Sequence, residues 1–184
     1  MTPEEIFTEI LNHMMKGLMV HEQLANYYDF LGLQGYRQCH EYHFLTESRS
    51  YRKLYHYYIK KYNQLLPEFR FDNPNIIPQD WIGYYRQQVD IKTKQKAVEE
   101  GLNQWVKWEG STCTLYEKMY KELIDMEEFA AATKIQHLLE DVEKELQTAE
   151  QYQLNKLSVN YDMTIVLEEQ KSLHYKYKKM IKEA

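Results

Sequence analysis

Apolar residues recur at helical spacing along most of the chain, beginning close to its first residue. The segment 2–5 (Thr-Pro-Glu-Glu) is a typical helix start, because an N-cap hydroxyl, an early proline and two acids all suit the positive end of a helix. The apolar face that follows consists of Ile6, Ile10, Met14, Leu18, Ala25 and Tyr28. We predict that this first helix runs to the glycine-containing turn at residues 32–35.

The same spacing predicts three further long helices and a shorter closing helix. Their expected ranges are 36–66, about 90–124, about 127–157 and about 163–182. The segment 67–89 contains three prolines and one glycine and keeps no regular period, so we predict an irregular connector there. The pattern as a whole is typical of an all-α fold.

The length of this connector bears on the topology. A helix of about 33 residues is about 50 Å long, and a connector of about 23 residues can span about 75 Å. The connector can therefore return the chain to the other end of the bundle, so that helix 90–124 runs parallel to helix 36–66. We predict a four-helix bundle, residues 1–157, with one long crossover. Residues 158–184 would form a helical extension that packs on the bundle or on a neighbouring subunit.

Charge and composition argue against some partners. The formal net charge is −5, whereas nucleic-acid binding needs a basic face. No apolar run approaches the roughly 20 residues of a membrane span, and the acidic N-terminal segment lacks the features of a signal peptide. We therefore expect a cytoplasmic protein with no nucleic-acid and no membrane partner. Cys39 and Cys113 are expected to be buried free thiols.

Some carboxylates fall on the apolar faces of the predicted helices, where charged side chains are rare. Glu109 lies at the centre of the apolar arc of helix 90–124. Glu47 lies on the apolar face of helix 36–66, and Glu143 lies on the flank of the face of helix 127–157. We expect these three side chains to be buried. In the first helix, His21 lies near the centre of the face and Glu22 on its flank, and the pattern does not choose between them.

The distances of these acids from the two short turns place them at about one level of the bundle. Glu22 and Glu47 are at similar distances from the first turn, as are Glu109 and Glu143 from the second. Buried carboxylates without partners would be prohibitively unstable, but metal ions would neutralise them. Carboxylates with some imidazole suit iron or manganese. His43 is a candidate ligand because it shares a helix face with Glu47.

These segments resemble the ferritin-like superfamily of di-iron carboxylate proteins. Residues 21–35 (HEQLANYYDFLGLQG) are similar to the family's first ligand helix, and residues 129–146 (FAAATKIQHLLEDVEKEL) to its fourth. Glu143 follows Glu109 by 34 residues, which is similar to the family's spacing between ligands of the third and fourth helices. The resemblance implies a ferritin-like bundle with the metal ligands Glu22, Glu47, Glu109 and Glu143, and with Glu140 completing a Glu-x-x-Glu pair.

The function implied by the resemblance is a homo-oligomeric protein with a di-iron or di-manganese centre. It would act in iron oxidation, storage or oxidative-stress handling, with ferroxidase-type oxidoreductase activity as one outcome. The chain departs from the family at Ser50 and Leu146, where histidine is expected. This departure favours an alternative, in which a metal-free ferritin-like bundle is an oligomeric scaffold or interaction protein. Glu47 and Glu109 would then be paired with basic or hydroxyl groups.

Overall fold

The computed structural model describes residues 1–66 and 89–183 of the 184-residue chain. These residues form five helices: α1 (Pro3–Phe30), α2 (Gln34–Tyr62), α3 (Ile91–Asp125), α4 (Phe129–Leu157) and α5 (Met163–Glu183). No strand occurs in the described part of the chain, so the predicted all-α class is confirmed. The predicted connector falls almost entirely on residues 67–88, which lie outside the described residues.

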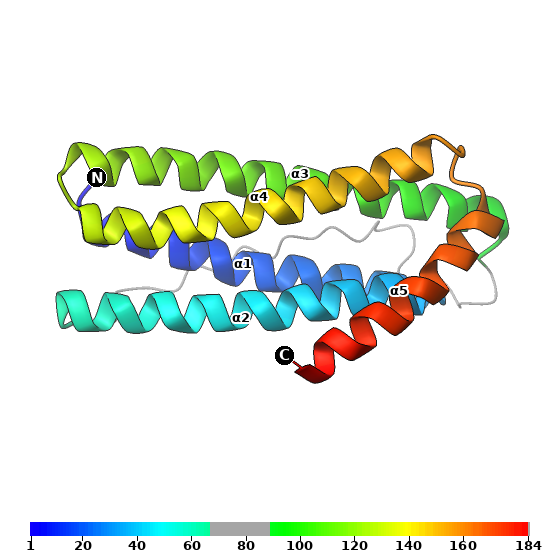
Figure 1. The fold of residues 1–184 in the computed structure, drawn as a ribbon, viewed down its shortest axis with the longest axis horizontal. Helices are drawn as coiled ribbons and strands as arrows, with labels where there is room; N and C mark the ends of the chain where they lie inside the picture. Colours follow the sequence, from blue (N-terminus) through cyan, green and yellow to red (C-terminus); the bar gives the residue numbers. More distant parts are fainter. Residues whose placement is uncertain (67–88, 184) are drawn as a thin grey trace.

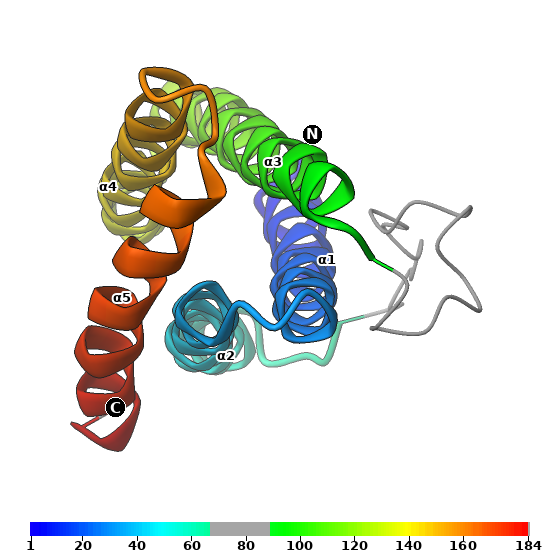
Figure 2. The ribbon, with the colours of Figure 1, turned by 90° about the vertical axis from the view of Figure 1, so that its right-hand side faces the viewer.

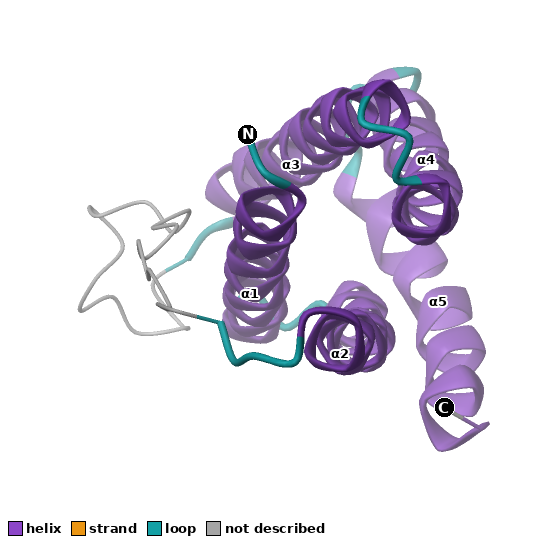
Figure 3. Cartoon of the chain, turned by 90° about the vertical axis from the view of Figure 1, so that its left-hand side faces the viewer, coloured by secondary structure: helices purple, strands orange, loops and turns teal. Residues whose placement is uncertain are grey.

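The first four helices lie along one long axis, and α5 crosses that axis obliquely (Figure 1). Helices α1 and α2 form one closely packed hairpin, and α3 and α4 form another. Helices α2 and α3 run in the same direction, as predicted for a bundle with one long crossover (Figure 1). Seen end-on, α1 lies between α2 and α3 (Figures 2 and 3). Helix α4 lies next to α3, across the bundle from α1.

Helix α1 begins at the predicted N-cap Thr2, and Glu5 completes a capping box there. The Glu5 backbone N–H donates to Thr2 Oγ1 at 3.2 Å, and the Thr2 backbone N–H donates to Glu5 Oε2 at 2.8 Å. Two of the helix's free N–H donors are thereby satisfied. The helix ends at Phe30, and Gly32 in the turn adopts φ +76°, a conformation that glycine accepts without strain.

Helix α2 ends earlier than the sequence suggested. We expected it to continue to Leu66, but it stops at Tyr62, because Asn63 adopts the left-handed conformation with φ 53°. Asparagine tolerates this conformation better than most residues, and its backbone N–H closes the helix by donating to the carbonyl of Ile59 at 2.8 Å. The prediction relied on the proline at residue 67 as the stop and overlooked this cap.

The interior contains two apolar cores at different levels of the bundle. One lies near the α1–α2 turn and includes Leu24, Tyr28, Tyr36, Val98, Leu102, Trp105 and Ala149. The other lies near the start of α1 and includes Ile6, Phe7, Tyr58, Tyr116, Leu123, Ile135 and Val142. The buried polar side chains of His21 and Glu109 fall between these two groups along α1 and α3. The bundle is therefore apolar at both ends and polar at one intermediate level.

Helix α5 packs along the first half of α2 (Figure 1). The Gly35 backbone N–H donates to Gln170 Oε1 at 3.0 Å, and the Tyr36 hydroxyl donates to Glu169 Oε2 at 2.6 Å. Lys156, at the end of α4, is buried and lies 2.5 Å from the same Glu169 carboxylate. These contacts bind α5 to both α2 and α4 and cover the end of the bundle nearest the polar level.

Candidate metal centre

One side chain from each of the four bundle helices meets at the polar level. His21 comes from α1, Glu47 from α2, Glu109 from α3 and Glu145 from α4. One ligand atom of each lies within 4.8 Å of the corresponding atoms of the other three. His21 and Glu109 are buried, with 0% and 1% of their side chains exposed, whereas Glu47 and Glu145 are about one-fifth exposed, at 20% and 21%. This set of four is called the ligand cluster below.

The side chains of the ligand cluster lie close together, but two of their polar atoms have no hydrogen-bond partner among the described residues. His21 Nε2 lies 2.8 Å from Glu47 Oε1 and 3.4 Å from Glu109 Oε1. Neither approach has hydrogen-bond geometry, and Nε2 has no other partner among the described residues. Trp105 Nε1 donates to Glu109 Oε1 at 2.9 Å, while Glu109 Oε2 is likewise without a partner in the described chain. Buried polar atoms without a partner are rare in proteins, and a bound ion or water would satisfy these two.

A glycine on α1 gives the Glu47 side chain room to approach. Gly17 lies one turn before His21, and a Cβ atom added at Gly17 would lie 3.0 Å from Glu47 Oε2 and 3.3 Å from the Trp108 ring. Any larger residue would push the carboxylate or the indole away from α1. Glycine at this position lowers helix stability by about 1 kcal/mol relative to alanine, but it permits the observed approach of Glu47 to α1.

Two more histidines form a layer beside the ligand cluster. His21 Nδ1 and His40 Nδ1 share a hydrogen bond at 3.1 Å, and the His21 ring is stacked on both His40 and His43 at 5.3 Å between centroids. His43 Nδ1 lies 3.3 Å from Glu145 Oε2. Burial, with the nearby His21 and His43, lowers the pKa of His40 well below its ordinary value. A neutral His40 can accept the His21 Nδ1–H, so Nε2, on the side of the carboxylates, is the His21 atom that would bind a cation in place of its own proton.

The pKa values of the ligand cluster and of His43 show that positive charge stabilises its carboxylates. Burial disfavours a charged His21, but Glu47 and Glu109 outweigh burial and raise its pKa to about 10. Burial raises the pKa of Glu109 to about 7 against the opposing effect of His21. Burial also opposes ionisation of His43 and Glu145, yet their mutual attraction raises the pKa of His43 and lowers that of Glu145. A bound cation can take over the role of these protons.

A cavity of about 340 Å³ reaches the ligand cluster from the side of the bundle between α2 and α4. Its inner wall includes three of the four cluster residues, Glu47, Glu109 and Glu145. Its outer wall includes the exposed side chains of Asp141 and Lys144. The cavity therefore connects the carboxylates with the surface and is large enough to admit ions and small molecules.

Three residues singled out from the sequence lie at this centre, and three do not. Glu47 and Glu109 belong to the ligand cluster, and His43 contacts it through Glu145. Glu109 is buried as predicted, whereas Glu47 is only partly buried. The residues that the structure places elsewhere are Glu22, Glu140 and Glu143, all of them exposed.

The three exposed acids lie on the surface of α1 and α4. On α1 the structure turns His21 inward, and Glu22 accepts a hydrogen bond from Asn26 at 3.1 Å on the surface. Glu140 accepts a hydrogen bond from Gln136 at 3.2 Å in the same way. Glu143 was expected to be buried, and that expectation was wrong. None of the three is part of the ligand cluster.

Glu145 is the residue that the sequence analysis missed. The predicted apolar face of this helix included Leu139, Val142, Leu146 and Ala149, with Glu143 on its flank between Leu139 and Leu146. In the structure Val142 and Ala149 are buried while Leu139 and Leu146 are only partly buried, and Glu145 lies three residues after Val142 and four before Ala149. The signal was present, because a carboxylate between two small or branched apolar residues at helical spacing shares their face.

The fold is that of the ferritin-like class of four-helix bundles, as comparison with solved structures shows. An open-pore ferritin from the hyperthermophilic archaeon Archaeoglobus fulgidus matches with a TM-score of 0.76 over 94% of this chain and 95% of that chain, at 13% sequence identity. An engineered closed form of the A. fulgidus ferritin matches with the same TM-score and identity, over 94% of each chain. No family model and no curated protein matches the sequence.

Proposed function

We propose that the chain is a ferritin-like metal-binding protein that holds divalent iron or manganese at the ligand cluster of His21, Glu47, Glu109 and Glu145. The observation that carries the proposal is the convergence of four ligand atoms, one from each bundle helix, within 4.8 Å. Three carboxylates and one imidazole form a donor set that suits iron and manganese. The ferritin-like fold and the name of the matched A. fulgidus protein support the same assignment.

The distances within the ligand cluster fit a shared cation. Bonds from such ions to nitrogen and oxygen are about 2.1 Å long, so neighbouring ligand atoms lie about 3 Å apart and opposite ones about 4.2 Å. His21 Nε2 lies 2.8 Å from Glu47 Oε1 and 3.4 Å from Glu109 Oε1, without hydrogen-bond geometry. Small shifts of the carboxylates would complete the coordination of one ion.

A second ion, as in a di-iron or di-manganese centre, would draw on the outer part of the same site. Glu109 Oε2 is available because it has no partner among the described residues, and His43 lies next to Glu145. Bound iron would supply redox chemistry toward oxygen or peroxide, in iron oxidation, storage or oxidative-stress handling. The chain itself orients Glu109 through Trp105 and provides the entrance between α2 and α4.

Metal titration of the protein and two variants on the same helix tests this proposal. The metal-free protein is titrated with Fe(II) without oxygen, and separately with Mn(II), by calorimetry with elemental analysis. Glu145→Gln should weaken binding at least about tenfold, because an amide is a poorer ligand than a carboxylate. Glu143→Gln is the matched control, since Glu143 is exposed two residues earlier and should bind as the wild type does. Absence of binding by the wild type would refute the proposal.

The alternative function is a metal-free scaffold, and one observation favours it. Glu47 lies 2.8 Å from His21, whose raised pKa of about 10 lets it neutralise the carboxylate without a metal. In this case neither iron nor manganese binds. Replacing His21 by Gln would then leave buried acids without a counter-charge and lower the free energy of unfolding by about 3–5 kcal/mol. A metal-binding wild type whose unfolding temperature rises with Mn(II) would exclude this alternative.

We also propose that the chain assembles into a homo-oligomer. Large apolar side chains are exposed around the α4–α5 junction: Leu154 (57%), Leu157 (59%), Ile165 (41%) and Leu167 (45%). Such exposure is typical of surfaces that contact another subunit. Light scattering after size-exclusion chromatography should give a mass several times that of the 22.4 kDa chain. A monomer at micromolar concentration would contradict this part of the proposal.

A further inference from the structure

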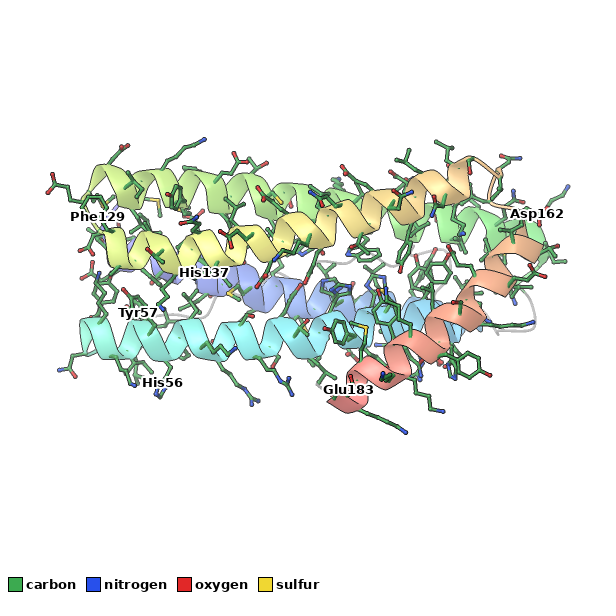
Figure 4. The ribbon with its side chains drawn as sticks, in the orientation of Figure 1. His56, Tyr57, Phe129, His137, Asp162 and Glu183 are labelled. Carbon is green, nitrogen blue, oxygen red and sulfur yellow. The ribbon has the colours of Figure 1, made fainter. Side chains whose placement is uncertain are left out.

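A second cavity lies between α2 and α4, on the side of the metal centre towards the end of α2. Its volume is about 770 Å³, which is within the range of small-molecule sites. The lining residues of α4 include Lys134 and His137, and those of α2 include Arg52, Lys53 and Lys60. Tyr57 of α2 and His137 of α4 lie at the same end of the bundle, where α4 begins at Phe129 (Figure 4). This cavity is called the basic groove below.

The basic groove gathers positive charge in a protein whose formal net charge is −5. Arg52, Lys53 and Lys60 line it from one helix, and Lys134 lines it from the other. None of these four cations forms a salt bridge with a carboxylate of the described residues. Asp141 is the only acid that lines the groove among the described residues, and its carboxylate lies 3.4 Å from Lys144. The described residues therefore do not neutralise the positive charge of the groove.

The basic groove is also lined by apolar and aromatic side chains. Leu54 and Leu138 supply apolar surface, and Tyr57 supplies an aromatic ring. The Lys134 ammonium lies 5.7 Å from the centre of that ring, a cation–π distance. The Lys134 side chain is exposed, and this contact places its ammonium beside Tyr57 of the groove. A ligand would meet this cation on α4 and the cations of α2 opposite.

We infer that the basic groove binds a small molecule that carries phosphate groups. Arginine and lysine from facing helices can contact several oxygens of one phosphate ligand, and hydrogen bonds between charged groups are the strong ones. The groove lies beside the metal cavity, because Ser50, Leu138 and Asp141 line both. Its charge does not depend on a bound metal, so the inference goes beyond the proposed function and can fail or succeed separately from it.

The test uses the full-length protein after removal of metals with a chelator, with pyrophosphate as the probe. Calorimetry at low ionic strength should show saturable binding that weakens as salt is added. The double variant Lys53→Gln/Lys134→Gln should weaken binding at least about tenfold, because each lost charge-assisted contact costs about that factor. Lys134→Arg keeps the charge and should bind as the wild type does. Circular dichroism confirms that each variant is folded.

The control is Lys171→Gln/Lys178→Gln, which removes the same charge from exposed positions of α5. It should change pyrophosphate affinity less than about twofold, because neither lysine lines the groove. Equal weakening by the control and the groove variant would show attraction to overall charge and overturn the inference. So would the absence of saturable binding to the wild type. Failure of metal binding in the earlier titration would leave this result unaffected.

Discussion

The indole of Trp105 holds the carboxylate of Glu109 from one turn away on α3. Trp105 Nε1 donates to Glu109 Oε1 at 2.9 Å, and both side chains are inaccessible to solvent, with 0% and 1% exposed. The bond orients the carboxylate and leaves its second oxygen, Oε2, without a partner among the described residues. Hydrogen bonds of this kind hold metal ligands in place, and their loss typically weakens metal binding.

Replacing Trp105 by phenylalanine tests this arrangement. The variant keeps an aromatic side chain but removes the indole N–H, so Glu109 can rotate and loses one buried partner. We expect metal affinity to fall about 10–100-fold and the free energy of unfolding without metal to fall by about 1–3 kcal/mol. Calorimetric titration with Mn(II) and chemical denaturation measure the two effects.

The matched control for this experiment is Trp108→Phe on the same helix. The Trp108 ring is stacked on His13 at 4.5 Å between centroids, and its indole has no hydrogen bond to the ligand cluster among the described residues. Its replacement should alter stability but change metal affinity much less than Trp105→Phe does. Equal losses of affinity in both variants would mean that packing, and not the hydrogen bond, sets the position of Glu109.

A second prediction concerns the closeness of α5 to α2. A Cβ atom at Gly35 would lie 2.0 Å from the backbone oxygen of Gln170, which no side-chain movement can relieve. Gly35→Ala should therefore displace α5 and disturb the packing of Leu173 and Tyr177 against the core. We expect a loss of about 1–3 kcal/mol in the free energy of unfolding. Trypsin should also cleave the lysine-rich α5 faster than in the wild type.

Gly110 provides the opposite case. It lies inside α3, and a Cβ atom added there would meet nothing within 4 Å. Gly110→Ala should raise the free energy of unfolding by about 1 kcal/mol, because alanine is the better helix former and no neighbour must move. Denaturation of both variants under the same conditions makes the comparison. Equal free energies of unfolding for Gly35→Ala and Gly110→Ala would contradict the close approach of α5 to α2.

A third prediction concerns the pH dependence of stability through His13. Burial, and to a smaller extent Lys16, lowers the pKa of His13 from 6.5 to about 4. Below pH 6.5 the unfolded chain binds a proton at this histidine that the folded chain does not take up until about pH 4. Stability is therefore lost as the pH falls from 6.5 to 4, by up to about 3 kcal/mol from this residue.

The variant His13→Phe keeps a ring against Trp108 but removes the titration. It also removes the hydrogen bond between His13 Nε2 and Thr112 Oγ1, 2.8 Å long, which lowers stability at every pH. The difference in free energy of unfolding between wild type and variant should shrink as the pH falls from 7 to 4, since only the wild type has this histidine. A difference that is constant over this range would contradict the lowered pKa of His13.

Much of the fold could be predicted because its causes are local. The capping box at Thr2, the helical spacing of the apolar residues and the two short turns are all readable from a few neighbouring positions. The parallel course of α2 and α3 followed from the length of the connector. The end of α2 could not be placed correctly, because the residues up to Leu66 continue the helical pattern. The left-handed conformation of Asn63 ends the helix before them.

The site could be predicted only in part, because it depends on how each helix is rotated about its axis. Glu109 lies at the centre of a wide apolar arc, so its burial does not depend on small rotations. The face of α4 is narrower, and a modest error in its centre exchanged Glu143 for Glu145. On α1 the sequence left His21 and Glu22 open, and only the packing of the neighbouring helices decides between them.

The position of a bound metal tests the central claim most directly. Crystals grown with Fe(II) or Mn(II) are measured at the metal's absorption edge, so that anomalous scattering locates each ion independently of the protein atoms. The account predicts a peak at bonding distance, about 2.1 Å, from His21 Nε2 and from carboxylate oxygens of Glu47, Glu109 and Glu145. A peak confined to the exposed acids Glu140 and Glu143, or no peak in metal-soaked crystals, would contradict it.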